Sequence, residues 1–154
     1  MNLKPLLAGF ALAFSINTST AQEIFIDVDE TEITSNTNRY IIPKAYKTLE
    51  VNNIELKYLL NQSSLESELN VHQSNNLIKL PFPNGQEIVF RFVESPVMSP
   101  ILSAKYPNIK TYLGESIDGR MTVRFDYSPN YGFHAMIMGL TDVIFIDPYT
   151  FHNA

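Results

Sequence analysis

The chain contains neither cysteine nor tryptophan, and its 11 lysine and arginine residues do not form a cluster. Without cysteine there are no disulfide bonds, thiolate metal ligands or cysteine nucleophile, so we expect the domain to depend on a hydrophobic core. The 16 aspartate and glutamate residues give a net charge of -5. Because phosphate groups are bound by clustered lysine and arginine side chains, this acidic balance argues against nucleic acid or an anionic membrane as a partner.

Recognisable catalytic motifs are also missing. The three histidines, at positions 72, 134 and 152, do not have the spacing of a zinc site such as His-Glu-x-x-His. No serine lies in a Gly-x-Ser-x-Gly or Ser-x-x-Lys arrangement. The acidic residues at positions 27, 29, 30 and 32 lack the glycine and the final glutamate of a calcium loop. We therefore expect no catalytic residue, metal site or cofactor in this chain.

For one histidine and two aspartates, both a structural and a catalytic role can be considered. His134 lies between Phe133 and Ala135 in an apolar stretch, which is more typical of a structural residue than of a ligand. We expect Asp126 and Asp147 at the ends of strands, where each would cap a turn. A small hydrolase would require His134 within hydrogen-bonding distance of a carboxylate in a pocket.

The first 21 residues have the features of a secretory signal peptide. Lys4 precedes an apolar run from Leu6 to Ile16, and small residues follow at Ser19 and Ala21. A buried N-terminal helix is the alternative, whereas a membrane span needs about 20 apolar residues. We predict a secreted protein that has no membrane contact after cleavage, and we exclude residues 1–21 from the fold.

The remaining chain is long enough for one domain. It is rich in aromatic residues, with ten phenylalanines and eight tyrosines in the full sequence, and this composition favours β-sheet. Ile24 to Val28 is a possible first strand, but a polar stretch follows it, so we predict a flexible arm at residues 22–38. We predict a single β-rich domain at residues 39–154, cut at its C-terminal edge because the chain ends soon after a core strand.

The clearest element is a hairpin. Two apolar runs, Leu77 to Phe82 and Ile88 to Val93, flank Pro83-Asn84-Gly85-Gln86, in which proline fixes φ and glycine tolerates a positive φ. Alternation and turn residues predict further strands at 46–51, 109–114, 121–127, 133–138 and 143–146. Short helices are expected at 54–60, capped by Asn53, and between Ser99 and Pro107. The predicted fold class is α+β, a mainly antiparallel β-sheet with one or two short helices.

Five residues directly after this hairpin form the candidate contact segment, and they are Glu94, Ser95, Pro96, Val97 and Met98. Pro96 and Pro100 interrupt hydrogen bonding between strands, so the chain must leave the sheet here and present an exposed, extended segment. The alternative is an ordinary strand exit in which Met98 packs in the core.

Several short phrases occur along the chain in a particular order. They are Arg39 with Pro43 and Tyr46, Leu80-Pro81 with Pro83-Asn84-Gly85, Glu94 to Met98, Tyr106-Pro107 with Ile109 to Tyr112 and Gly114, Gly132 to Met136, and Ile146 to Tyr149. In this order and spacing they resemble the N-terminal pro-region of secreted bacterial zinc metalloproteases of the reprolysin-like (metzincin) family. The resemblance covers about Arg39 to Tyr149.

This resemblance implies a non-catalytic pro-region whose partner is the cognate metalloprotease catalytic domain. Such a region assists folding of the protease and keeps it latent until cleavage. The zinc ion and the catalytic motif belong to the catalytic domain, so neither is carried over to a residue of this chain. Many metzincin pro-regions silence the metal with a cysteine thiolate, but this chain has no cysteine.

Latency would therefore require steric blocking by an extended segment laid along the substrate cleft. Glu94 to Met98 is the candidate, with Glu94 reaching toward the metal. The alternative function is a secreted β-rich binding module whose tyrosine side chains grip a glycan or a surface protein. The tyrosines considered for that surface are Tyr106, Tyr112, Tyr127 and Tyr131.

Overall fold

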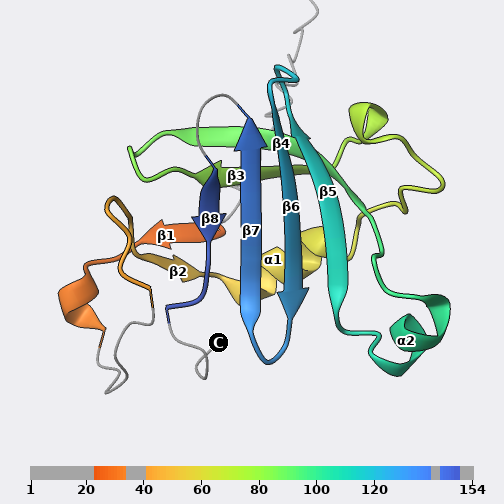
Figure 1. Ribbon diagram of the computed structural model, residues 1–154, viewed down its shortest axis with the longest axis horizontal. Coiled ribbons are helices and arrows are strands. Elements are labelled where there is room, and N and C mark those ends of the chain that lie inside the picture. Colours follow the sequence, from red (N-terminus) through yellow and green to blue (C-terminus); the bar gives the residue numbers. More distant parts are fainter. Residues whose placement is uncertain (1–22, 34–40, 140–142, 150–154) are drawn as a thin grey trace, which may run out of the picture.

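A computed structural model of the chain describes residues 23–33, 41–139 and 143–149 (Figure 1). The described residues form a six-stranded antiparallel sheet, a separate two-stranded sheet and two α-helices. The predicted α+β class, with a mainly antiparallel sheet and short helices, is confirmed. The predicted signal peptide, His152 and part of the predicted arm lie outside the described residues.

The large sheet is a simple meander in which each strand pairs with the next one along the chain. Its strands are β3 (Leu77–Pro81), β4 (Glu87–Glu94), β5 (Lys110–Ser116), β6 (Met121–Ser128), β7 (Gly132–Gly139) and β8 (Ile144–Ile146). The small sheet pairs β1 (Phe25–Asp27) with β2 (Leu49–Val51). Hydrophobic runs and turn residues were sufficient to predict these strands, with shifts of up to three residues at their ends.

Turn chemistry explains two of the hairpins. Gly85, between β3 and β4, has φ of 84°, and Gly119, between β5 and β6, has φ of 70°. Both lie in the left-handed region that glycine adopts without steric cost. Asp118 supports the second turn, because its carboxylate accepts hydrogen bonds from the Ser116 hydroxyl and the Arg120 N–H.

The helix α1 (Asn53–Leu60) begins one residue earlier than predicted. Its N-cap is Asn52 rather than Asn53, because the Asn52 side chain accepts hydrogen bonds from the N–H groups of Ile54 and Glu55. The buried face of the helix consists of Leu56 and Leu60, four residues apart. Helix α2 (Pro100–Lys105) has the predicted cap, since the Ser99 hydroxyl accepts a hydrogen bond from the N–H of Leu102.

Part of the predicted flexible arm belongs to the fold. Phe25, on β1, is buried, and its ring centroid lies 5.2 Å from that of Phe133 on β7. Asp29 then caps a 3₁₀ turn at Glu30–Glu32. The prediction of a flexible arm was therefore wrong for residues 24–33, whereas the possible first strand is confirmed. Within the described residues, polar side chains at Asp29 and Thr31 form the capped turn.

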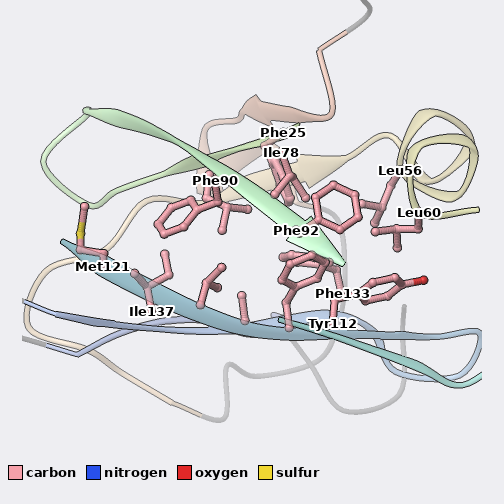
Figure 2. Packing of buried hydrophobic residues seen from close by; sticks show 14 of the residues in the cluster. Phe25, Leu56, Leu60, Ile78, Phe90, Phe92, Tyr112, Met121, Phe133 and Ile137 are labelled. Atoms are coloured by element: carbon pink, nitrogen blue, oxygen red, sulfur yellow. The ribbon is translucent and has the colours of Figure 1, made fainter. Parts of the chain in front are cut away.

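The core lies between two layers. In Figure 1, β5, β6 and β7 stand in front, while α1 and the β1–β2 pair lie behind them and the β3–β4 hairpin runs across the back. Figure 2 shows the buried side chains between these layers. The core cluster contains Phe25, Leu56, Leu60, Ile78, Leu80, Phe82, Phe90, Phe92, Tyr112, Met121, Val123, Phe125, Phe133, Ala135 and Ile137.

The opposite face of the large sheet is only partly covered. The 3₁₀ turn at Val71–Gln73 packs against β4 and β5, and after it the Ser74 hydroxyl donates a hydrogen bond to the Phe92 carbonyl over 2.6 Å. Leu65 also forms a parallel bridge with Glu94. This covering explains why Val93, which points away from the main core, is fully buried. The outward-facing side chains of β6 and β7 are less covered, and we call this surface the open face.

Gly114 on β5 marks a close approach between neighbouring strands. A Cβ atom at this position would lie 2.7 Å from Cγ1 of Val123 and 3.0 Å from the Arg91 carbonyl oxygen. We expect Gly114→Ala to lower the free energy of unfolding by about 1–3 kcal/mol, because overpacking forces side chains or backbone to shift. Urea denaturation measures this change.

A double-mutant cycle tests the physical reason. In a Val123→Ala background the added methyl group has more room, so Gly114→Ala is expected to cost less than in the parent chain. An equal cost in both backgrounds would show that the Val123 side chain does not cause the destabilisation.

Candidate functional site

Glu94, the first residue of the candidate contact segment, is held within the sheet. It ends β4, and its carboxylate accepts a hydrogen bond from Nζ of Lys110 over 2.7 Å. The Glu94 side chain is only 16% exposed. Its carboxylate is therefore directed toward Lys110, and the structure offers no support for the expectation that it reaches a partner's metal.

Ser95 continues the pairing with β5 by one residue. Its N–H donates to the Thr111 carbonyl over 2.8 Å, and the Thr111 hydroxyl donates to the Ser95 carbonyl over 2.7 Å. The Ser95 hydroxyl accepts a hydrogen bond from Nη1 of Arg124 over 2.8 Å. Ser95 is buried, so it positions the segment instead of contacting a partner.

The segment leaves the sheet at Pro96, as the proline pattern predicted. Pro96 is exposed, and Val97 is 71% exposed although its N–H is held by the Thr111 hydroxyl. Met98 is partly exposed and does not belong to the core cluster. The alternative in which Met98 packs in the core is therefore wrong, and the accessible part of the segment is Pro96 to Met98.

A second candidate site lies on the open face. The register pairs Thr111 with Asp126 and Asp126 with His134, so that three polar side chains form a row across β5, β6 and β7. Asp126 lies inside β6, which corrects the expectation that it ends a strand. Asp147 does follow the end of β8, as expected.

These side chains surround a hollow that is open to solvent and has a volume of about 330 Å³. We call it the open-face hollow. Its titratable and charged lining residues are Arg124, Asp126, His134 and Asp147, and its apolar lining includes Val97, Met136 and Phe145. Val97 therefore belongs both to the candidate contact segment and to the wall of this hollow.

The Asp126–His134 pair is the main electrostatic feature of the hollow. Nδ1 of His134 lies 3.4 Å from Oδ1 of Asp126, and Nδ1 is buried without a hydrogen bond. Burial raises the pKa of the Asp126 carboxyl; the His134 imidazole opposes this shift, and the Asp147 carboxylate adds to it. Burial in the wall of the hollow therefore disfavours the ionised form of Asp126.

The Asp126–His134 contact is looser than the usual contact of an acid–base pair. In a catalytic pair, the histidine nitrogen and the carboxylate oxygen that orients it are usually about 2.6–3.2 Å apart and form a hydrogen bond. The Asp126–His134 contact is longer and lacks that geometry. The nearby hydroxyls of Ser95 and Thr111 are held by hydrogen bonds to other groups, so neither is poised next to a base.

The four tyrosines considered for a glycan surface do not gather on one face. Tyr112 is 1% exposed, and its ring stacks on Phe125 at a centroid distance of 4.9 Å. Burial also raises the pKa of Tyr112. Tyr106 and Tyr131 are exposed, whereas Tyr127 is partly buried and lies under Nζ of Lys57. A continuous tyrosine surface is therefore not present on these residues.

Within the part of the chain that the structure describes, no group of three or more histidine, aspartate or glutamate side chains is placed to bind a metal ion. Nδ1 of His72 contacts the carboxylate of Glu115, which is paired with Thr122 and not with Asp126 on β6.

Sequence reasoning missed the polar row because it placed Asp126 at a strand end. A signal was available, since Asp126 and His134 each lie four residues from Asn130 in the turn between β6 and β7. A short hairpin centred at that turn pairs residues at equal distances on either side of it. The position of Asp147 near them depends on β8 returning beside β7, which local sequence does not specify.

Comparisons of the chain with protein-family models, with curated proteins and with solved structures found no match. Among the residues that the structure describes, no helix has the length and apolar character needed to cross a membrane.

Two aspartates should respond to pH in opposite ways. We expect Asp126→Asn to raise the midpoint of thermal unfolding at neutral pH, because it removes a charge whose pKa is raised by burial. Arg124, His134 and Asp147 also line the hollow, and they are unchanged in this variant. The gain should disappear as the pH falls through the pKa of folded Asp126, where the native carboxyl becomes neutral.

Asp118→Asn is the matched control. Hydrogen bonds from the Ser116 hydroxyl and the Arg120 N–H lower the pKa of Asp118, so this carboxylate stabilises the fold above its unfolded pKa. The variant should unfold at a lower temperature at neutral pH and match the parent chain in acid. Shifts of the same sign for both variants would contradict this account.

Proposed function

We propose that this chain is the non-catalytic pro-region of a secreted zinc metalloprotease precursor, which assists folding of the protease and keeps it latent. The sequence phrases described above support this proposal. The structural observation that carries it is an exposed apolar connection between β4 and β5.

We define the docking surface as Val97, Ile101 and Leu102 of this connection.

The docking surface has little support from the domain itself. Helix α2 has six residues, none of which is buried, and Ile101 is 86% exposed. Leu102 is 43% exposed. An isolated helix of this length is unstable in water. The Ser99 cap and Pro100 stabilise it only modestly. Contact with a partner would stabilise the helix and bury its apolar side chains.

The position of the docking surface fits a role in steric blocking. Figure 1 shows α2 at one side of the sheet, beyond the end of β5 and away from α1. Pro96 and Val97, which belong to no helix or strand, lead into this helix, and proline is compatible with an extended segment lying in a cleft. This mode of latency does not require a thiolate, and it does not require Glu94, whose carboxylate is held by Lys110.

The folded core supports the proposed role in assisting folding of the protease. The large sheet and α1 bury an aromatic core that does not involve the docking surface. A domain of this kind can fold before its partner and then offer a preformed surface on which the catalytic domain completes its own folding.

The test is inhibition of the mature catalytic domain of the matching protease by this chain added in trans. We expect the chain to slow peptide hydrolysis, and the double variant Val97→Ser/Ile101→Ser to inhibit at least about tenfold less well, because two apolar contacts are lost. Inhibition constants measured with a fluorogenic peptide give the comparison.

Ile54→Ser provides a matched control, since Ile54 is 80% exposed but lies on α1. It should inhibit as well as the parent chain. Lack of inhibition by the parent chain, or equal losses in the control and the double variant, would refute the proposed docking surface. Circular dichroism of each variant shows whether the fold is retained.

A further inference from the structure

The open-face hollow contains more negative than positive charge. Asp126 and Asp147 contribute two carboxylates, and in the described part of the chain neither forms an ion pair with a lysine or an arginine. Arg124 is the single arginine in the lining, and its Nη1 donates to the Ser95 hydroxyl. The hollow is therefore complementary in charge to a cationic group.

Apolar side chains form the remaining wall. Phe145 on β8 is 60% exposed, and Met136 and the exposed Val97 also line the hollow. An aromatic ring beside carboxylates suits a guanidinium group, which can stack on the ring while donating two hydrogen bonds to a carboxylate. The methylene groups of an arginine side chain would contact the aliphatic wall.

We propose that the open-face hollow binds the guanidinium group of an arginine side chain presented by the partner protein. The proposal rests on the proposed function for the identity of that partner, and the binding chemistry is carried by the hollow itself. Val97 links the two sites, because it belongs to the docking surface and to the wall of the hollow.

The state of Asp126 supports this assignment. Oδ1 of its carboxylate lies 3.4 Å from Nδ1 of His134, so the carboxylate retains capacity to accept further hydrogen bonds from a ligand. Burial and the neighbouring Asp147 raise its pKa, and a bound cation would offset both effects by stabilising the ionised form. Asp126 would thus contribute to binding through the charge that burial disfavours.

The test is a nuclear magnetic resonance titration of the full chain with acetyl-Ala-Arg-Ala-amide. Acetyl-Ala-citrulline-Ala-amide is the matched control ligand, because citrulline has a similar shape without the charge. We expect saturable shifts of the backbone amides of Asp126, Met136 and Phe145 with the arginine peptide, at least about tenfold weaker binding of the citrulline peptide, and a similar loss in Asp147→Asn.

Glu55→Gln is the matched control variant, since Glu55 is a carboxylate on α1, and it should bind the arginine peptide as the parent chain does. Asp147 follows β8 and is exposed, so Asp147→Asn tests the hollow even if Asp126→Asn perturbs the sheet. Absence of saturable shifts at the hollow, equal binding of the citrulline peptide or of the corresponding lysine peptide, or unchanged binding by Asp147→Asn would overturn the proposal.

The two proposals fail separately. Binding of the arginine peptide without inhibition of the protease would refute the proposed function and leave the guanidinium site supported. Inhibition of the protease without binding of the peptide would refute the guanidinium site alone.

Discussion

The stacking of Tyr112 on Phe125 is the contact on which both the core and the open face depend. These rings lie on neighbouring strands at a centroid distance of 4.9 Å, and Phe92 meets both of them edge-on. Because side chains alternate between the faces of a strand, burying Tyr112 and Phe125 turns Thr111 and Asp126 to the opposite face. The register that builds the aromatic core therefore also builds the polar row.

Each of the two candidate sites contains side chains in an environment that disfavours them energetically. The docking surface exposes Ile101 and Val97 to water, and the hollow holds Asp126 in a partly buried position that disfavours its charge. Elsewhere the structure is consistent, with capped helices and turns that contain the expected residues. Local costs of this kind are typical of surfaces retained for binding, because a partner can offset them.

Most strands and both helices could be predicted from local sequence, and the errors have specific physical causes. The predicted N-cap of α1, Asn53, is wrong by one residue: either of two adjacent asparagines can cap a helix, and only the hydrogen bonds show that Asn52 does so. The strand at Phe25 lies beside a polar turn, and its burial depends on contact with Phe133, more than one hundred positions away. No local pattern contains that contact.

The sequence by itself determined the alternating pattern of the strands, the glycine turns and the point at which Pro96 takes the chain out of the sheet. These features follow from backbone conformations and side-chain period, which depend on neighbouring residues alone. Only the tertiary structure decided that Glu94 pairs with Lys110, that Tyr112 is a core residue, and that a hollow unites Val97 with Asp126 and Asp147. Those relations arise from the order and register of the strands, and they join residues that are not neighbours along the chain.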